Sequence, residues 1–493
     1  MTGPYPSGST ATGAGDAAVF RDLTGIVLDA LAQGTADRGG PLPSGGPDEV
    51  AARTRAAIGA VLPQHGVGPE AALREVVGAA ARGAADPAHP HCVAHLHTPA
   101  LAVAVAADLA ASALNPSMDS WDQAPAAAVV EGEVTAALAR LVLPRAAAPD
   151  ALITSGGTEA NLLALLFARE RAARAGTSPL RVVCGANAHH SVHRAAWVLG
   201  LPEPRTLPCT RGRLTPDVVA DALREHRGPT LVVATAGTTD EGLIDPLPQL
   251  AEVTAAHGAE LHVDAAYGGP LCFSDALAPR LAGLDAAVSV TFDLHKLGWQ
   301  PLAAGALVLA DAAAVRHLSH RADYLNAEDD TEAGLPDLLG RSLRTSRRPD
   351  ALKVAVTMRA LGRSGIGALV EHCVRTAEGF ADAVDAHPAV RRRPGRIDIS
   401  TVLFRPTAAD DLSDEEGDAL VAAVRRRLLH EGRAVLGRAV AEDADGLRRL
   451  WLKATLLHPA ASVDDLGELL DLVAAVAAVR APAPAPTNNG DAP

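Results

Sequence analysis

The sequence predicts an α/β protein with a large domain built on a mostly parallel sheet, a small C-terminal α+β domain and a helical N-terminal arm. In the middle of the chain, short apolar runs such as ALITSGG, LVVATAG and AVSVTFD alternate with Ala- and Leu-rich helical segments. This alternation is typical of a parallel sheet covered by helices on both faces, with the ligand site at the carboxyl ends of the strands. The length of 493 residues also exceeds that of a single hydrophobic core, so a second domain is expected.

The composition divides the chain into five predicted regions. Residues 1–16 and 481–493 are dominated by small residues and proline and are expected to be disordered. Residues 17–88 have apolar residues at three-to-four spacing and predict helices that need a partner surface. Residues 89–365 form the predicted large domain. Strand-like runs such as RIDISTVLFRP then alternate with helical ones, which predicts a small domain over residues 366–480.

Charge and cysteine usage exclude several classes of function. The 44 Lys and Arg residues against 58 Asp and Glu residues give a net charge of −14, so we expect neither nucleic acid nor a membrane as a partner. No apolar run reaches the ~20 residues that span a bilayer, and the N-terminus lacks a secretory signal pattern, so a cytoplasmic location is expected. The five cysteines form no CxxC pair, which argues against a disulfide framework and a metal site.

Lysine is scarce in this chain, which has only Lys296, Lys353 and Lys453. Lys296 follows a strand-like run in the segment SVTFDLHKLGWQP. A desolvated lysine can lose its proton and attack a carbonyl carbon, which an arginine cannot do. Most single lysines are solvated surface charges. The position of Lys296 at the end of a buried strand nevertheless favours a Schiff-base lysine.

A carboxylate in a second strand-end motif complements this lysine. Asp264 follows the apolar strand of LHVDAAYGGP, and the small side chain of Ala266 would let a ring lie close to it. A pyridine ring needs a carboxylate beside its nitrogen to stay protonated and to accept electrons from a broken bond. A strand-end aspartate alone is as often a helix cap. Together with Lys296, it indicates pyridoxal 5'-phosphate as the cofactor.

Three further motifs supply candidate contacts for such a cofactor. In TSGGTEANLLALL a strand ends at two glycines and a helix begins near Thr158, which is a common means of binding phosphate but also a common turn in α/β proteins. The segment TAGTTDEGLIDP supplies Thr238 and Thr239 after another strand. The segment ANAHHSVHRAA supplies His189, which could stack on a ring or move a proton.

The order SGGTEAN, AHHS, TAGTT, HVDAAYGG and DLHK resembles the group II pyridoxal-phosphate decarboxylases, which have the fold-type I (aspartate-aminotransferase-like) architecture. The resemblance covers residues 89–361 and continues more faintly to the end. It implies that Lys296 is the Schiff-base lysine, Asp264 pairs with the pyridine nitrogen and His189 stacks on the ring. It also implies a homodimer with sites at the subunit interface and residues 17–88 as the dimerising arm. Family positions around the cofactor and its phosphate match Gly157, Thr158, Thr239, Asp293 and His295.

The substrate is expected to be a small polar or diamino acid. The segments HPHCVAHLHTP and ALNPSMDSWDQAP look most like the 2,4-diaminobutyrate decarboxylase subgroup. His91, Cys92 and Asp119 stand where decarboxylases of aromatic acids carry aromatic side chains, which favours a cationic substrate end. If Asp119 instead caps a helix or pairs with an arginine, such as Arg341 or Arg344 of the partner subunit, an acidic amino acid of the aspartate or glutamate type is the alternative.

Several alternatives remain open at this point. The substrate could be free or attached to a carrier protein, and a transaminase, a carbon–sulfur lyase or an inactive homologue would share the cofactor fold. The four histidines between residues 89 and 97 alternate as on one strand face and could be metal ligands. Because the family needs no metal, we interpret them as pocket and packing residues.

The proton donor and the role of one further lysine are also open. Leu338 occupies the position where many family members carry a mobile-loop tyrosine that returns a proton to the substrate carbon. Either His189 or Tyr324 takes this role, the loop belongs to a subgroup that lacks the tyrosine, or the product is an aldehyde rather than the simple amine. Lys453 is expected near the substrate carboxylate or as an ordinary strand residue.

Overall fold

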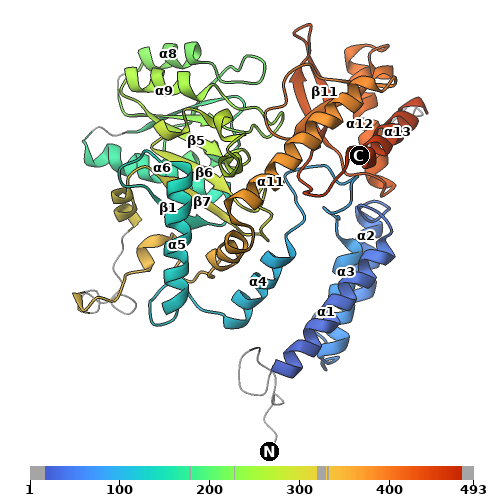
Figure 1. Cartoon of the computed structure of the whole chain (residues 1–493). Coiled ribbons are helices and arrows are strands. Elements are labelled where there is room, and N and C mark those ends of the chain that lie inside the picture. The colour runs from blue at the N-terminus through green and yellow to red at the C-terminus, as the bar shows by residue number, and fades with distance from the viewer. Residues whose placement is uncertain are drawn as a thin grey trace, which may run out of the picture.

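The computed structural model describes residues 11, 17–176, 179–226, 228–318, 329 and 332–479. Tyr324 and nearly all of the terminal segments that we expect to be disordered lie outside these residues. The described chain forms a large α/β domain, a small α+β domain and a helical arm (Figure 1).

The large domain contains the mostly parallel sheet that the sequence predicts. Its strand order is β1-β7-β6-β5-β4-β2-β3, and β7 is antiparallel to both of its neighbours while every other pair is parallel. The strands are β1 (Asp150–Thr154), β2 (Arg181–Gly185), β3 (Arg205–Leu207), β4 (Thr230–Thr235), β5 (Glu260–Ala265), β6 (Ser289–Asp293) and β7 (Gly305–Leu309).

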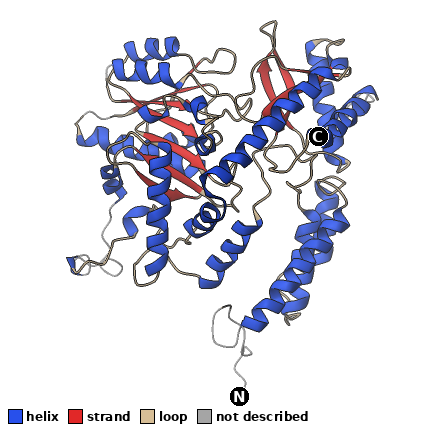
Figure 2. Cartoon of the chain, in the orientation of Figure 1, coloured by secondary structure: helices blue, strands red, loops and turns tan. Residues whose placement is uncertain are grey.

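Helices cover both faces of this sheet (Figure 2). Along β4, Leu231 and Val233 face the core under α6 and α7, whereas Val232 and Ala234 face the core under the opposite helices. Burial on both faces explains why the strands are continuous apolar runs. The helices and 3-10 turns of this domain are α4 (Ala102–Leu114), α5 (Pro125–Val142), α6 (Gly157–Arg174), α7 (Ser191–Val198), α8 (Pro216–Arg224), α9 (Leu247–Ala256), η1 (Gly269–Phe273), η2 (Ala278–Leu281), η3 (Leu284–Ala286), η4 (Ala312–Leu318) and η5 (Leu339–Arg341).

A long helix, α11 (Ala351–Ala386), connects the two domains and is kinked at Gly362, where φ is 64°. The small domain that follows has an antiparallel sheet of order β10-β11-β9-β8. Its helices α12 and α13 begin at capping boxes, in which Ser413 and Ser462 accept hydrogen bonds from the backbone three residues later. The elements are β8 (Val390–Arg392), β9 (Thr401–Pro406), η6 (Thr407–Ala409), α12 (Asp414–His430), β10 (Gly437–Glu442), β11 (Arg448–Thr455) and α13 (Val463–Ala478).

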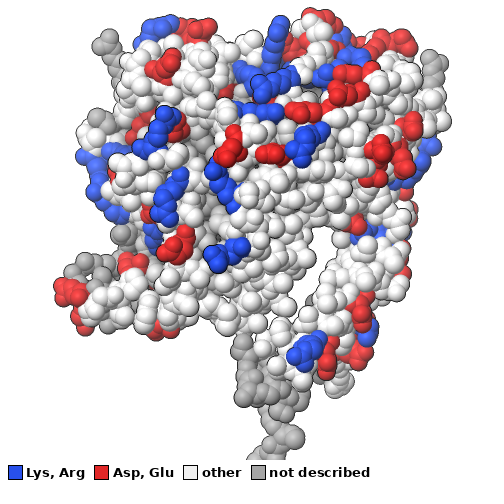
Figure 3. All heavy atoms as spheres, in the orientation of Figure 1, with Lys and Arg blue, Asp and Glu red and all other residues white. Residues whose placement is uncertain are grey.

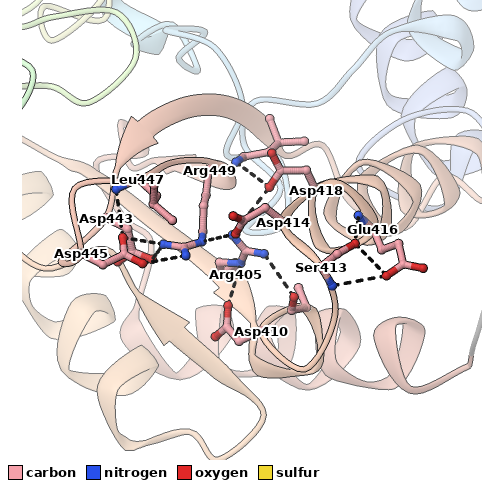
Figure 4. Close-up of polar contacts among 12 residues, drawn as sticks. Arg405, Asp410, Ser413, Asp414, Glu416, Asp418, Asp443, Asp445, Leu447 and Arg449 are labelled. Carbon is pink, nitrogen blue, oxygen red and sulfur yellow. Dashed lines mark hydrogen bonds and ion pairs between the residues drawn. The ribbon is translucent and has the colours of Figure 1, made fainter.

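One face of the small sheet carries a buried arginine next to a buried tryptophan. The guanidinium carbon of Arg405 lies 5.8 Å from the ring centre of Trp451, and both side chains are almost fully buried. Arg405 also pairs with Asp410 at 3.3 Å and with Asp418 at 3.7 Å (Figure 4). A buried charge needs such partners, so this cluster fixes the loop before α12 against the sheet.

The N-terminal arm consists of the helices α1 (Ala17–Arg38), α2 (Pro47–Ile58) and α3 (Pro69–Gly83). In Figure 1, α1 and α3 lie side by side and project below the small domain. They pack closely at Gly34, where an added Cβ would lie 2.6 Å from the Ala81 Cβ. Leu28, Leu31 and Val76 remain exposed on the arm, as expected for helices that need a partner surface.

The prediction that the four histidines between residues 89 and 97 alternate on one face of a strand was wrong. Successive turn hydrogen bonds join His89 to Asp86 and Cys92 to His89, and His95 adopts a left-handed conformation with φ of 62°. These turns break the extended alternation, so only an isolated bridge from Cys92 to Val435 remains. Within the described ranges, no group of three or more His, Cys, Asp or Glu side chains could hold a metal ion. None of the helices in the described part of the chain is long and apolar enough to cross a membrane.

Candidate functional site

A cavity of about 380 Å³ lies at the carboxyl ends of β4, β5 and β6 and at the start of α6. All nine residues that the sequence predicts around the cofactor line this cavity. The structure therefore brings together motifs that are up to 139 positions apart in the sequence, from Gly157 to Lys296. The nine are Gly157, Thr158, His189, Thr239, Asp264, Ala266, Asp293, His295 and Lys296.

The amine of Lys296 is oriented by a carboxylate from the end of β6. Lys296 Nζ lies 3.0 Å from Asp293 Oδ2, and the side chain of Asp293 is almost fully buried. His295 Nε2 lies 3.6 Å from the same oxygen, and its Nδ1 lies 2.8 Å from the carbonyl oxygen of Ala304. The turn after β6 therefore places the Lys296 amine at the cavity, with Asp293 and His295 held beside it.

The carboxylate of Asp264 lies on the β5 side of the cavity. Its Oδ2 accepts a hydrogen bond from Asn161 Nδ2 at 2.8 Å, and its Oδ1 accepts one from the backbone N–H of Ala266 at 3.1 Å. Both bonds restrict the rotation of the carboxylate. Because Asp264 and Lys296 both line the cavity, a ligand there can contact a carboxylate and an amine at once.

His189 also lines the cavity and contacts Ser191. Its Nδ1 lies 2.8 Å from Ser191 Oγ, and its ring centre lies 4.1 Å from that of His190. Burial, together with the nearby His190 and Lys296, lowers the pKa of His189, while the Asp264 and Asp293 carboxylates oppose this shift. The imidazole is therefore uncharged at neutral pH.

The turn before α6 is formed by Gly156 and Gly157, so no side chain separates its backbone from the cavity. Gly156 has a φ of 150°, and a Cβ there would lie 2.8 Å from the His295 ring. A Cβ on Gly305 would lie 2.6 Å from the Gly156 Cα, so neither position has room for a side chain. Backbone N–H groups at the start of an 18-residue helix, together with the nearby Thr158 hydroxyl, form a site that suits a phosphate.

The two threonines after β4 have different environments. The Thr238 hydroxyl accepts a hydrogen bond from the backbone N–H of Leu243 at 3.0 Å and so closes its own loop. Thr239 lines the cavity, and its carbonyl oxygen accepts a hydrogen bond from Lys453 at 2.7 Å. Lys453, which we expected near the substrate carboxylate or as a strand residue, is in β11 and binds this loop.

The weaker substrate candidates do not line this cavity in the described part of the chain. Asp119 is buried and accepts a hydrogen bond from Gln123 at 2.8 Å. Cys92 bridges to Val435, and His91 lies against the carbonyl of Arg433. Leu338 is buried beside η5, where Arg341 forms an ion pair with Asp150 at the opposite end of β1 from the cavity.

Sequence reasoning missed a group of buried polar side chains next to Asp264, of which Asn161 also lines the cavity. Asn161, Ser191, His262 and Thr291 are completely buried and hydrogen-bonded to one another or to Asp264. Two signals could have found them. Asn161 interrupts an apolar helix face, and His262 lies two residues before Asp264 on the same face of β5.

An amine, a carboxylate, a stackable imidazole and a phosphate cradle in one cavity fit pyridoxal phosphate, because each matches one functional group of that cofactor. Together with the sheet order, they define a fold-type I enzyme dependent on this cofactor. Residues 70–405 match the family described as the pyridoxal-dependent decarboxylase conserved domain. The chain belongs to this family, and it is a pyridoxal-phosphate-dependent amino-acid decarboxylase.

The chain is also similar to individual proteins and to a solved structure. It is 41% identical over 420 residues to an L-2,4-diaminobutyrate decarboxylase of Rhizobium meliloti (84% of this chain and 83% of the relative). It is 32% identical over 450 residues to an L-2,4-diaminobutyrate decarboxylase of Acinetobacter baumannii (86% and 87%). A solved glutamate decarboxylase domain of the diaminobutyrate-pyruvate transaminase and L-2,4-diaminobutyrate decarboxylase from Vibrio parahaemolyticus superposes with a TM-score of 0.81 at 31% identity, covering 95% of this chain and 97% of that one.

Proposed function

We propose that the enzyme converts a diamino acid of the 2,4-diaminobutyrate type to the corresponding diamine and carbon dioxide. The observation that carries this proposal is the similarity, over more than four fifths of the chain, to two L-2,4-diaminobutyrate decarboxylases. The cavity supports it, because every residue expected to contact the cofactor faces the same space.

Each of the chain's own residues has a defined task in this proposal. Lys296 Nζ would hold the cofactor at its aldehyde group, and Asp293 Oδ2 orients that amine from 3.0 Å. Asp264 would keep a proton at the ring nitrogen, and His189 would pack against the ring. The backbone at Gly157 and the Thr158 hydroxyl would bind the phosphate. When bound, pyridoxal phosphate supplies a ring that accepts the electrons released as the carboxylate leaves.

His189 is the group that we propose to return a proton to the substrate carbon. Leu338 has no acidic group and is buried away from the cavity. His189 lines the cavity and has one ring nitrogen, Nε2, outside its contact with Ser191. His189→Gln should therefore lower kcat by about 100-fold or more, since general acid catalysis contributes at least that much.

We propose that the active form is a cytoplasmic homodimer. Exposed apolar side chains lie on α1 at Leu28 and Leu31 and on α4 at Val105, Leu109 and Leu114. Figure 3 shows that charged side chains are sparse around α4 and that the arm stands apart from the large domain. In such a dimer, Asp119, His91 and Cys92, which do not line the cavity of their own subunit, would contribute to the site of the partner subunit. Leu28→Glu with Leu31→Glu should shift the mass measured by light scattering from that of a dimer to that of a monomer.

The substrate is tested by comparing kcat/KM for carbon dioxide release from 2,4-diaminobutyrate, ornithine, lysine, aspartate and glutamate. The proposal predicts the highest value for 2,4-diaminobutyrate. Asp119→Asn should lower that value by about tenfold or more if the carboxylate pairs with the substrate cation. A higher value for aspartate or glutamate would favour the acidic substrate class. Activity confined to an acylated carrier protein would favour the bound form.

A further inference from the structure

A continuous buried path of hydrogen bonds connects Asp264 to His189. Asn161 Nδ2 donates to Asp264 Oδ2 at 2.8 Å and to Ser191 Oγ at 2.8 Å. Ser191 Oγ in turn lies 2.8 Å from His189 Nδ1. Asn161 and Ser191 are completely buried. Asp264 and His189, which both line the cofactor cavity, are thus joined by two buried side chains, of which Asn161 also borders the cavity.

The orientation of the Asn161 amide is set by the carboxylate. An ionised carboxylate accepts hydrogen bonds only, so the amide atom 2.8 Å from Asp264 Oδ2 must be the nitrogen. The amide oxygen then faces Thr291 Oγ1 at 2.6 Å and His262 Nε2 at 3.0 Å. The Thr291 hydroxyl donates to this oxygen. With two donated bonds and the Thr291 bond made, Asn161 cannot rotate without losing several of them.

His262 packs against the oxygen side of the Asn161 amide. It is completely buried, and burial lowers its pKa to about 4, so its ring is neutral and has a single N–H. Its Nε2 lies 3.0 Å from Asn161 Oδ1, and its Nδ1 lies 3.0 Å from the Ser289 carbonyl oxygen and 2.8 Å from Ser289 Oγ. The ring proton can serve only one of the two carbonyl-type oxygens, so Thr291 is the firm donor to Asn161 Oδ1.

The same logic fixes the tautomer of His189. Ser191 Oγ has one proton, and it already accepts from Asn161, so the proton is available to His189 Nδ1. The backbone N–H of Ser191 also points to this nitrogen at 3.3 Å. Nδ1 is therefore an acceptor, and the proton of the neutral ring resides on Nε2.

We propose that Asn161 is a positioning residue that couples the two cofactor-contacting groups: it holds the Asp264 carboxylate in place and, through Ser191, keeps the proton of His189 on Nε2. This inference rests on the proposed function only for the contacts of Asp264 and His189 with the cofactor. It adds a reason for the buried amide, which would otherwise be a costly residue in an apolar helix face.

The test uses three near-isosteric variants of the full-length protein. Asn161→Leu removes both donors of the path. Ser191→Ala removes the link between Asn161 and His189 but keeps the bond from Asn161 to Asp264. Thr291→Val removes a contact on the far side of the amide. Circular dichroism and the midpoint of thermal unfolding establish that each variant is folded. The readouts are the dissociation constant of pyridoxal phosphate by equilibrium dialysis and the pH midpoint of the bound cofactor's visible absorption.

We expect Asn161→Leu to weaken cofactor binding by about tenfold or more, because Asp264 loses a buried donor. Ser191→Ala should leave the dissociation constant within about threefold but move the pH midpoint, since the Asn161–Asp264 bond is kept while the link to His189 is lost. Thr291→Val should change both readouts less than Asn161→Leu does, because Asn161 keeps its donors to Asp264 and Ser191. The charged and titratable groups that surround His189 and the path are Asp264, Asp293, Lys296, His190 and His262, and all are retained in every variant.

The proposal is overturned if Thr291→Val and Asn161→Leu have equal effects. It is also overturned if Asn161→Leu folds and its dissociation constant and pH midpoint are unchanged, because Asn161 is then only a packing residue. If Asn161→Leu does not fold, the contrast between Ser191→Ala and Thr291→Val decides, and an unchanged pH midpoint in Ser191→Ala contradicts the path. None of these readouts uses a substrate. A wild-type protein that binds cofactor but releases no carbon dioxide from diamino acids would therefore contradict the proposed function alone.

Discussion

The amine of Lys453 and the carbonyl oxygen of Thr239 lie 2.7 Å apart, and this hydrogen bond joins the small domain to the loop after β4. Two similar bonds follow along the sheet. After β5, the hydroxyl of Tyr267 lies 2.9 Å from Ser400 Oγ, and after β6, Trp299 Nε1 donates to the carbonyl of Leu457 at 2.7 Å. The small domain therefore holds the carboxyl ends of three adjacent strands, which are the ends that form the cavity.

Replacing Lys453 by Met should loosen the Thr239 loop while preserving most of the side-chain volume. We expect the dissociation constant of pyridoxal phosphate to rise by about 5- to 10-fold, because the Thr239 carbonyl loses its charged donor. Lys453→Arg retains a donor and should change the constant less. Equal binding by the wild-type and Met proteins, measured by equilibrium dialysis, would show that the loop is held without Lys453.

Gly305→Ala should disrupt the phosphate-binding turn before α6, because Gly305 packs against Gly156 in that turn. The added Cβ would lie 2.6 Å from the Gly156 Cα and 2.9 Å from its backbone nitrogen, and backbone atoms cannot move aside independently. We expect cofactor affinity to fall by about tenfold or more, given overpacking costs of ~1–3 kcal/mol. Gly132→Ala is the matched control, because that glycine is exposed in α5 with nothing within 4 Å of an added Cβ. The idea fails if both variants bind cofactor like the wild type.

The sequence predicted the sheet and nine of the seventeen residues that line the cavity, because these nine lie in motifs near strand ends with a recognisable chemical purpose. Asn161 and His262 were missed because their partners come from other elements, and a helix face or strand face gives no sign of a cross-element hydrogen bond. The turns at residues 89–97 were missed for a local reason. Alternating histidines resemble a strand face, but here the hydrogen bonds of the chain close successive turns instead.

The buried His262 should make stability depend on pH. Burial lowers its pKa from 6.5 to about 4, so between these values the unfolded chain binds a proton that the folded chain does not. The contribution of neutral His262 to the free energy of unfolding is thus complete above pH 6.5. It is lost as the pH falls towards 4, and the free energy of unfolding decreases by about 1.4 kcal/mol per pH unit at most.

His262→Gln keeps a donor for Asn161 but removes the titration. We expect it to lose less unfolding free energy than the wild type between pH 7 and pH 5, as measured by urea denaturation. His65→Gln at an exposed position is the control. A wild-type pH dependence that persists unchanged in His262→Gln would assign it to other groups.

Arg405→Ala should destabilise the small domain. The variant leaves a cavity beside Trp451 and removes the partner of Asp410 and Asp418 (Figure 4). Deleting a large buried side chain costs about 2–5 kcal/mol, so the midpoint of thermal unfolding should fall clearly. Arg427→Ala removes an exposed ion pair with Glu431 and should cost less than about 1 kcal/mol. Similar midpoints for the two variants would show that the Arg405 cluster contributes little.

The most direct test of the central claim measures carbon dioxide released from 2,4-diaminobutyrate by the purified wild-type enzyme and by Lys296→Ala, each with added pyridoxal phosphate. We predict steady release with formation of the diamine by the wild type and none above background by the variant. Release by both proteins, or none by a wild-type protein that binds the cofactor, would contradict diamino-acid decarboxylation at Lys296.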